Sequence, residues 1–375
     1  MKKLVYVDPQ SYRNLSMYDY SLLMGIENYK IVYCCNEQYD GPILDNVDYL
    51  PIFTYRKKMN PIVKIVNYLR SLLRLVSVLR KDRPDVLHIQ WWKQWHLDYY
   101  FLSIYKKYAK QVVFTAHNLV PHNSGETMKI KCIKYYNKVD KIIVHDKNSK
   151  NELITDFGID NNKISVIAHG ILNFNVDEKD VESATNKYIA KYHLREKLVF
   201  ASMGTQSPYK GTDLICNAYA SSDYLQTNKD VFLIIAGKGN IATQDFAKCY
   251  SNVLVADYEL SDAEFQAIMN LTDVLLLPYR KISQSGVLLT AIHNQVPFAV
   301  TPMGGLTDPL DTAPIGWIIP DPTIESVREC MEYLANNIET TKAVKHNQQN
   351  WNLVKAKYDW RHISLQTEDF YHKVL

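Results

Sequence analysis

The residues best suited to chemistry follow apolar, strand-like runs, in short polar tips. In SMGTQSPYKG, Gly204 and Lys210 follow the run that ends near Phe200, and a helix-like stretch comes next. A lysine at a helix start opposes the positive end of the helix dipole, and a bound anion would resolve that conflict. The tip therefore indicates either a phosphate site or a solvated lysine on a loop. It is not a Walker loop, because GxxxxGK followed by Ser or Thr is absent.

Two further tips have a similar composition. SQSG follows DVLLLPYRKI and opens an apolar helical run, so Ser285, Gly286 and Val287 would present free N–H groups to an anion. AGKGN, which contains Gly237, follows the run VFLII. Each tip alone is also typical of a plain turn, and Gly-x-Gly without the full dinucleotide pattern does not indicate NAD. Two such tips on neighbouring strand ends of one sheet favour a diphosphate ligand.

Histidines mark a corresponding tip in the first half of the chain. AHNLVPH places His117, Asn118 and His122 directly after a strand-like run. Histidines in a polar loop after a strand more often face a ligand site than a core. No third ligand lies at a suitable spacing, so we expect no zinc site here.

Other aromatic and histidine residues of this half allow two interpretations. Trp91 and Trp92 in QWWKQW would either stack on a sugar or another acceptor, or pack against the neighbouring domain. His88, His145 and His169 lie within or at the end of strand-like runs and are interpreted as structural.

The elements that must position these tips alternate between strand-like and helix-like segments. Runs such as KLVYV, DVLHIQ and KIIVHD are separated by amphipathic stretches, which predicts a parallel sheet covered by helices on both faces. The pattern lapses into polar, acidic sequence around 171–195, which we interpret as a connection with a short helix. A second series of strand-like runs follows. Because ligands bind beyond the carboxyl ends of parallel strands, the tips are where chemistry is expected.

Composition sets broad limits on the class of protein. A chain of 375 residues with 47% hydrophobic and 22% charged residues is typical of a globular protein of two domains. The start of the chain lacks signal-peptide form, and no run approaches eighteen apolar residues. Six scattered cysteines without a CxxC pair favour reduced thiols in a cytoplasmic protein.

Positive charge is concentrated in the first half of the chain. Residues 1–170 hold 25 Lys and Arg against 16 Asp and Glu, and the remainder holds 18 against 24, which gives the net charge of +3. The segment 61–81 predicts a helix with a basic stripe of Lys64, Asn67, Arg70, Ser71, Arg74, Ser77 and Lys81. Arg56, Lys57 and Lys58 precede it. The helix is either a core helix with a solvated basic stripe or one that lies on an anionic membrane surface.

Taken in order, several segments resemble glycosyltransferase family 4, whose members are retaining enzymes with the GT-B fold. YKGTDL, IIAGKG, SQSGVLLTA, VPFAVTPMGGL and GWIIP follow its second domain, while DVLHIQW and VVFTAHNLVPH resemble its first. The resemblance spans nearly the whole chain. It implies two tandem Rossmann-like doubly wound α/β domains facing a central cleft, one over 1–175 and one over 196–357. The C-terminal helix, 358–375, would cross back to the first domain.

The resemblance also implies roles for individual residues. Lys210 would bind the donor diphosphate beside Gly204, Gly237 and the amides of Ser285, Gly286 and Val287. His117, with Asn118, would lie by the transferred sugar as the catalytic tip, and Tyr258 near the nucleobase. His122, Trp91 and Trp92 would be on the acceptor side.

Two departures from the family pattern bear on the donor. The arginine usually found ahead of the lysine is replaced around Thr205 to Ser207. The family's pair of glutamates falls near Ser283 and on Thr290, and a threonine hydroxyl would hold donor hydroxyls more weakly than a carboxylate. Which nucleotide and which sugar are bound is therefore left open.

The expected function is a metal-independent retaining glycosyltransferase without a cofactor. It would move a sugar from a nucleotide sugar to a glycan or lipid-linked acceptor, in bacterial surface polysaccharide synthesis, with no nucleic-acid partner. A peripheral position on the inner face of the cell membrane is a further expectation. The alternatives are a sugar-nucleotide epimerase of the same fold and a non-catalytic sugar-nucleotide-binding partner of another transferase.

Overall fold

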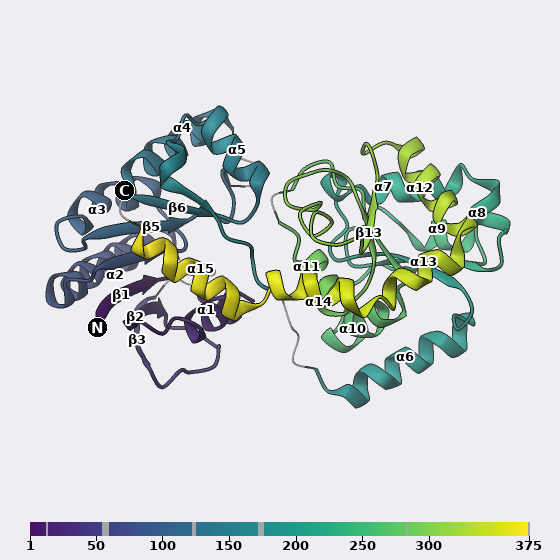
Figure 1. Cartoon of the computed structure of the whole chain (residues 1–375), viewed down its shortest axis with the longest axis horizontal. Coiled ribbons are helices and arrows are strands. Elements are labelled where there is room, and N and C mark those ends of the chain that lie inside the picture. Colours follow the sequence, from purple (N-terminus) through teal and green to yellow (C-terminus); the bar gives the residue numbers. More distant parts are fainter. Residues whose placement is uncertain (13, 55–59, 122–124, 172–175, 283, 374–375) are drawn as a thin grey trace. The chain divides into compact units, whose positions relative to one another are not determined.

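The chain folds into two compact units (Figure 1). The computed structural model describes residues 1–12, 14–54, 60–121, 125–171, 176–282 and 284–373. Unit 1 comprises Met1–Gly170 and Tyr358–Leu375, and unit 2 comprises Ile171–Lys357.

Unit 1 is built on a parallel sheet in the order β3-β2-β1-β4-β5-β6-β7. Its central strands are rich in Val, Ile and Leu. Their side chains belong to hydrophobic cores on both faces of the sheet, so these strands are buried on both faces. The strands are β1 (Lys2–Val7), β2 (Tyr29–Asn36), β3 (Val47–Phe53), β4 (Val86–Ile89), β5 (Gln111–Thr115), β6 (Lys141–Val144) and β7 (Ile164–Val166).

Helices cover both faces of this sheet. One face carries α2 (Pro61–Asp82), α3 (Trp95–Tyr105), α4 (Glu126–Lys138) and α5 (Lys147–Thr155). The other carries α1 (Asn14–Met24) and the last helix of the chain, α15 (Trp360–His372). A short 3₁₀ turn, Asn161–Lys163, precedes β7. The helix expected over 61–81 is therefore present as α2, with proline at its first position.

Unit 2 has a second parallel sheet, in the order β10-β9-β8-β11-β12-β13. The strands are β8 (Leu198–Met203), β9 (Val231–Ala236), β10 (Val253–Ala256), β11 (Val274–Leu277), β12 (Phe298–Val300) and β13 (Gly316–Ile318). The prediction of two Rossmann-like parallel-sheet domains is confirmed.

The helices of unit 2 also lie around its sheet. α7 (Thr212–Ala220), α8 (Asp223–Thr227) and α12 (Ile324–Asn336) share one core with the strands. The others are α6 (Glu178–Tyr192), α9 (Gln244–Lys248), α10 (Asp262–Leu271), α11 (Gly286–His293), α13 (Ile338–Lys345) and α14 (Gln348–Lys357). The acidic stretch expected to hold a short helix forms α6, a helix of 15 residues capped by the side chain of Asp177. α6 packs on α10.

The last helix, α15, belongs to unit 1 through contacts with residues far away in the sequence. The fully buried ammonium group of Lys141, on β6, donates to the carbonyl oxygen of Phe370 at 2.5 Å and also to that of Lys373. The hydroxyl of Ser364 donates to the carbonyl of Leu22 at 2.7 Å. Glu368 accepts from the N–H of Glu27 at 3.1 Å. These bonds join α15 to α1 and to the sheet.

Among the described residues, no helix combines the length and the apolar character that crossing a bilayer requires.

Lys141→Met should weaken the attachment of α15, because it leaves two carbonyl oxygens without their charged donor in a buried place. We expect a loss of about 1–3 kcal/mol, the usual consequence of an unsatisfied buried polar group. Thermal unfolding would shift to lower temperature, and amide exchange in 360–372 would accelerate. Lys107→Met, a change at an exposed lysine of the same unit, is the matched control. Equal exchange in the two variants would contradict the assignment.

Candidate functional site

In unit 2, the predicted ligand-binding tips follow four neighbouring strands, β10, β9, β8 and β11. Because these strands are parallel, the tips emerge at one edge of the sheet. The predicted residues lie after β8 (Gly204 and Lys210), after β9 (Gly237), after β10 (Tyr258), and at the start of α11 (Ser285, Gly286, Val287 and Thr290).

The tips of β8 and β9 touch through their backbones. Gly204 has φ +88° and Gly237 has φ +135°, conformations that residues with a Cβ rarely adopt. A Cβ atom at Gly237 would lie 2.1 Å from the carbonyl oxygen of Gly204. The N–H of Gly204 donates to the carbonyl of Ala236 at 2.9 Å. The two tips can approach this closely only because position 237 carries no side chain.

Gln206 holds these two tips together, a role that no sequence pattern predicted. The residue is 5% exposed, and its side-chain N–H₂ donates to the carbonyl of Gly237 at 2.8 Å. Its side-chain oxygen accepts from the N–H groups of Ile241 and Ala242, at 3.1 and 2.7 Å. Gln206 lies in the stretch where the family resemblance places an arginine. A neutral amide committed to the backbone thus occupies this place instead of a cation.

Lys210 extends toward the same tip. A Cβ atom at Gly204 would lie 3.3 Å from Nζ of Lys210 and 3.3 Å from a methyl carbon of Val287. Gly204, Lys210 and Val287 are therefore brought together. Burial lowers the pKa of Lys210, and within the described part of the chain no carboxylate forms a salt bridge with it. An anion bound beside Gly204 would meet a cation whose charge is not already paired.

The start of α11 adds N–H groups to this place. Ser285 is the N-cap, and its hydroxyl accepts from the N–H of Leu288 at 3.4 Å. The N–H groups of Gly286 and Val287 come earlier in the first turn, where a helix has no internal acceptor for them. Thr290, in contrast, is 1% exposed and its hydroxyl donates to the carbonyl of Gly286 at 3.0 Å. It does not share the open face of Gly286.

An ion pair fixes the lysine segment to the tip of β11. The guanidinium of Arg280 forms two 2.7 Å hydrogen bonds with the carboxylate of Asp213 on α7, and also donates to the carbonyl of Pro208. Gly211, with φ +71°, packs so closely that a Cβ would lie 2.2 Å from the carbonyl oxygen of Pro278. The position of Lys210 relative to α11 is therefore set by contacts on both sides of the lysine.

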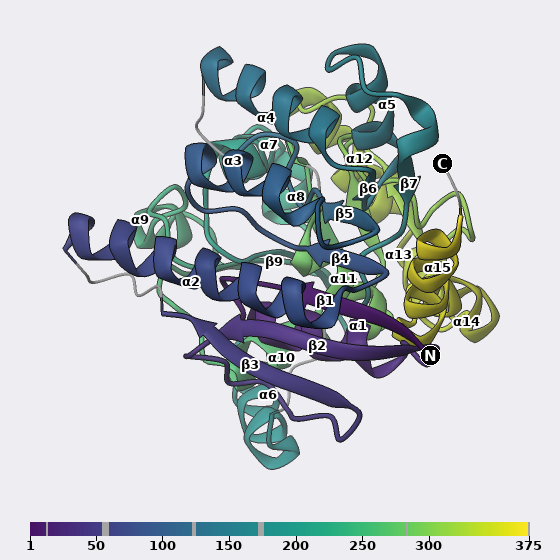
Figure 2. The same ribbon diagram turned by 90° about the vertical axis from the view of Figure 1, so that its left-hand side faces the viewer.

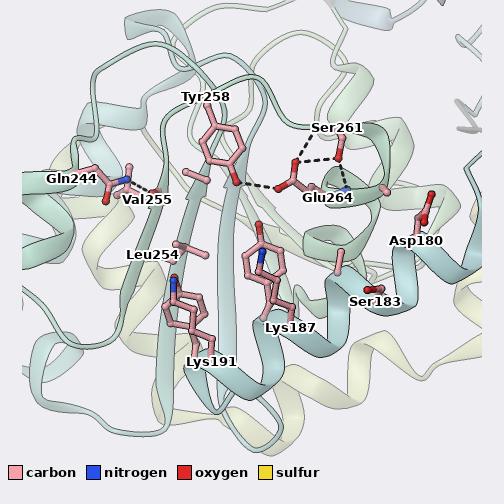
Figure 3. A pocket seen from close by; sticks show the side chains of 15 residues that line it. Asp180, Ser183, Lys187, Lys191, Gln244, Leu254, Val255, Tyr258, Ser261 and Glu264 are labelled. Atoms are coloured by element: carbon pink, nitrogen blue, oxygen red, sulfur yellow. Dashed lines mark hydrogen bonds between the residues drawn. The ribbon is translucent and has the colours of Figure 1, made fainter.

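Tyr258 lies in a separate pocket of about 510 Å³ (Figure 3). Its hydroxyl donates to the carboxylate of Glu264 at 3.1 Å, and its ring is 45% exposed. Lys187 and Lys191 of α6 line the opposite side of the pocket. Among the described residues that line it, none comes from the tips of β8 or β11. Neither Lys210 nor the start of α11 therefore lines the pocket of Tyr258.

One contact still connects the tip of β10 to that of β9. The carboxylate of Asp257, next to Tyr258, accepts from the N–H groups of Gly239 and Asn240 at 2.9 and 3.1 Å. The three tips of β8, β9 and β10 are therefore joined in series through Gln206 and Asp257.

In unit 1, polar side chains end the neighbouring strands β4, β5, β6 and β7. Nε2 of His117 lies 2.8 Å from Oε1 of Gln90, and its Nδ1 lies 3.1 Å from Nε2 of His145. Gln90 in turn contacts Nε2 of His88 at 3.1 Å. The ring of His169 lies 5.4 Å from that of His145. His117 is therefore held from both sides by residues of adjacent strand ends.

Burial keeps these imidazoles neutral. It holds the pKa of His117 well below its usual range and lowers the pKa of His145 to about 3, with neighbouring histidines adding to both shifts. His145 donates its Nδ1–H to the carbonyl of Ile167 at 2.9 Å, and its Nε2 lies 3.1 Å from Nδ1 of His117. Nε2 of His117 faces Oε1 of Gln90 at 2.8 Å. His117 is thus an oriented, uncharged ring.

A pocket of about 440 Å³ lies beside this ring. Trp91 stacks on His117, with ring centres 4.5 Å apart and planes at 9°, and Trp92 and Asn118 also line the pocket. Lys93 adds a cation whose pKa burial lowers to about 8, against the opposing effect of Asp8 and Asp98. Aromatic faces, an amide and one cation are the groups that hold a sugar ring.

The structure changes the interpretation of the histidines in one respect. His88 and His145, taken from the sequence as structural, are buried as that interpretation requires, yet they also position Gln90 and His117. The sequence feature that could have indicated this positioning role is that both histidines lie at or near the ends of strand-like runs. His122 lies outside the described residues.

No group of three His, Cys, Asp or Glu side chains that could hold a metal ion occurs in the part of the chain that the structure describes.

Two family profiles match the chain. Residues 29–171 match the profile described as Glycosyltransferase Family 4, and residues 195–337 match the one described as Glycosyl transferases group 1. No curated protein matched the chain by sequence.

Solved structures of similar fold cover almost all of the chain. A sucrose-phosphate synthase from Thermosynechococcus elongatus has a TM-score of 0.71 at 14% identity, covering 99% of this chain and 98% of that one. Alr3699/HepE from Anabaena, in complex with UDP-glucose, has a TM-score of 0.68 at 13% identity, with 99% of both chains covered. WaaG, a glycosyltransferase involved in lipopolysaccharide biosynthesis, has a TM-score of 0.64 at 13% identity, covering 99% and 100%. At such identities the likeness shows the fold.

Gly237→Ala should separate the tips of β8 and β9, because the new methyl group would overlap the Gly204 carbonyl. We expect unit 2 to lose at least the roughly 1–3 kcal/mol of an unfavourable backbone conformation. Gly204→Ala is the matched control, since its Cβ would meet only the ends of two side chains. Thermal unfolding of the two variants compares them. A loss no larger for Gly237→Ala than for the control would show that the backbone contact is not tight.

Proposed function

The chain belongs to glycosyltransferase family 4 and has the GT-B fold, and from this premise we propose that it transfers a sugar from a nucleoside diphosphate sugar to a glycan or lipid-linked acceptor. The transfer retains the configuration of the sugar and needs no metal ion. The observation that carries the proposal is the convergence of Gly204, Lys210 and Val287 at the start of α11.

The donor diphosphate is assigned to this convergence in unit 2. When the sugar leaves, negative charge grows on the diphosphate, and a positioned cation with N–H groups stabilises that charge without rearrangement. Lys210 supplies the cation, and Gly286 and Val287 supply the N–H groups at the positive end of α11. In many transferases a metal ion neutralises the same charge, and here the lysine and the helix start take that part.

The acceptor side is assigned to unit 1. The pocket beside His117 offers Trp91 and Trp92 for stacking, with Asn118 and Lys93 for hydrogen bonds to hydroxyls or to an acidic group. The neutral His117 ring, fixed by Gln90 and His145, positions the reacting sugar by shape and hydrogen bonding. No residue is assigned as a nucleophile.

Bacterial surface polysaccharide synthesis is the setting that we propose. Support comes from the fold shared with WaaG, which acts in lipopolysaccharide biosynthesis. Acceptors in such syntheses are growing glycans or sugars on lipid carriers, and both present a sugar that an aromatic pocket can hold.

Donor turnover distinguishes this proposal from its rivals. UDP- and GDP-sugars are incubated with the full-length protein, with and without a glycan acceptor, in the presence of EDTA. Acceptor-dependent release of the nucleotide supports a transferase. Release of nucleotide and free sugar without an acceptor would indicate an epimerase-type reaction, and nucleotide binding without any turnover would indicate a non-catalytic partner. Activity that EDTA abolishes would overturn the metal-independent mechanism.

Lys210→Ala should weaken binding of the nucleoside diphosphate by roughly 10- to 100-fold, since hydrogen bonds to charged groups are worth about 1.5–3 kcal/mol. Isothermal titration with UDP and GDP measures the change. Lys229→Ala is the control, because this exposed lysine precedes β9 and so lies at the opposite edge of the sheet. Affinities equal to those of the unaltered protein would remove Lys210 from the donor site.

His117→Ala should lower turnover much more than donor affinity, because the ring is assigned to the reacting sugar and not to the nucleotide. Turnover and the Kd for the nucleotide are measured side by side. His346→Ala, at an exposed histidine of unit 2, controls for loss of an imidazole. A turnover within about twofold of the unaltered protein, equivalent to some 0.4 kcal/mol, would leave His117 a structural residue.

A further inference from the structure

Helix α2 exposes apolar side chains that the core of unit 1 does not use. The helix packs on β3 and α3 through Tyr68, Leu72, Leu75 and Leu79, which are all at most 3% exposed. Its first half nevertheless leaves several aliphatic side chains open to solvent. They are Ile62 (73% exposed), Val63 (44%), Ile65 (48%), Val66 (42%), Leu69 (36%) and Leu73 (53%).

Most of these side chains form one stripe along the helix. At about 100° per residue, Ile62, Ile65, Val66, Leu69 and Leu73 fall within a sector of about 100°, beside the buried face. We call this the apolar stripe. Of the predicted basic stripe, Arg70, Arg74 and Lys81 fall on its other side, opposite the buried face, and all three are exposed. The name basic stripe is kept below for these three residues. Val63 lies in the basic sector.

The core-helix interpretation of this segment is therefore incomplete. A helix that only covers a sheet needs one apolar face, and α2 has that face at Tyr68 and Leu72. The apolar stripe is additional, and scattered single apolar residues would not form a stripe. Ser71, which the sequence placed in the basic sector, is 2% exposed and donates to the carbonyl of Asn67.

The chemistry of the two stripes identifies what can cover them. α2 carries five Lys and Arg and a single acidic residue, Asp82, at its last position. A second copy of the chain, paired through α2 about a twofold axis, would bring the two basic stripes near each other. An anionic bilayer instead accepts aliphatic side chains among its acyl chains and basic ones among its head groups.

We propose that unit 1 docks on an anionic membrane surface through α2, with the apolar stripe entering the interface and the basic stripe contacting lipid head groups. The proposal does not rest on the proposed function. Arg56, Lys57 and Lys58, which precede α2, lie outside the described residues.

The direction of α2 relates this surface to the pocket beside His117. α2 follows β3, so it begins at the carboxyl edge of the sheet. Trp91 and His117 lie at the same edge, because they directly follow β4 and β5. In Figure 2 the first turns of α2 extend past the carboxyl ends of β2 and β3. The residues of the apolar stripe closest to that edge are Ile62, Ile65 and Val66. Docking would hold the edge that carries the pocket next to the bilayer.

Vesicle flotation of the full-length protein tests the proposal. The vesicles are phosphatidylcholine alone, or an equal mixture of phosphatidylcholine and phosphatidylglycerol, at low and at high salt. We expect flotation with the anionic vesicles at low salt, little with the neutral ones, and a decrease at high salt as the charges are screened.

Two double variants separate the stripes. Ile65→Ser with Leu69→Ser removes part of the apolar stripe, and Arg70→Gln with Arg74→Gln removes two charges. Since each basic residue near an anionic surface contributes roughly a fivefold factor, the charge variant should bind about 25-fold more weakly. Lys30→Gln with Arg361→Gln is the matched control, because it changes the net charge equally with residues away from α2. Circular dichroism checks that each variant folds.

Three results would overturn the proposal. The first is no flotation with anionic vesicles at low salt. The second is an equal loss of flotation in the charge variant and its control. The third is an apolar variant that converts a dimer to a monomer while it floats as before, which would assign the apolar stripe to a second copy of the chain. The assay needs no nucleotide or acceptor, so its outcome is independent of the activity test.

Discussion

The parallel direction of the strands is the constraint on which both candidate sites depend. Every strand of the two described sheets pairs in parallel with its neighbours, so the carboxyl ends of each sheet share one edge, and the helices that follow begin there. An edge of this kind collects loop residues from four or five places in the sequence. The positive ends of the helices that begin at this edge also point toward a ligand bound there. In unit 2 these two effects coincide at Gly204, Lys210 and the start of α11.

The carboxyl edges of the two sheets carry different groups and suit different ligands. The edge of unit 2 is made of backbone, with glycines that allow close approach and a lysine that forms no salt bridge with any described carboxylate. It suits a ligand of high negative charge, because N–H groups and the ammonium are already in place. The edge of unit 1 is made of side chains, and burial keeps its histidines neutral. Neutral rings that hold each other in place suit an uncharged sugar.

The sequence predicted the strand ends well, because each apolar run stops where a polar tip begins. For this reason it placed His117 and Lys210 in the tips after strands, and Gly286 at the start of a helix, where the structure has them. It could not identify Gln206 or Gln90, since a glutamine in a polar loop has no distinctive neighbours, and their roles arise from partners 27 to 36 residues away. The pocket of Tyr258 could not be predicted from the sequence either, because it forms only when α6 packs on α10. Periodicity showed that α2 is amphipathic, but only the packing showed which apolar residues remain exposed.

The place of α15 has a consequence for synthesis of the protein. Unit 1 is discontinuous in sequence, so the whole of unit 2 leaves the ribosome before the final segment of unit 1 exists. Domains usually fold in the order in which they emerge. Until α15 has been synthesised, Lys141 and the face of α1 that packs on α15 stay uncovered in unit 1, while unit 2 can already fold. The last eighteen residues then complete the first unit, so a chain released eighteen codons early would retain a finished unit 2 and an open unit 1.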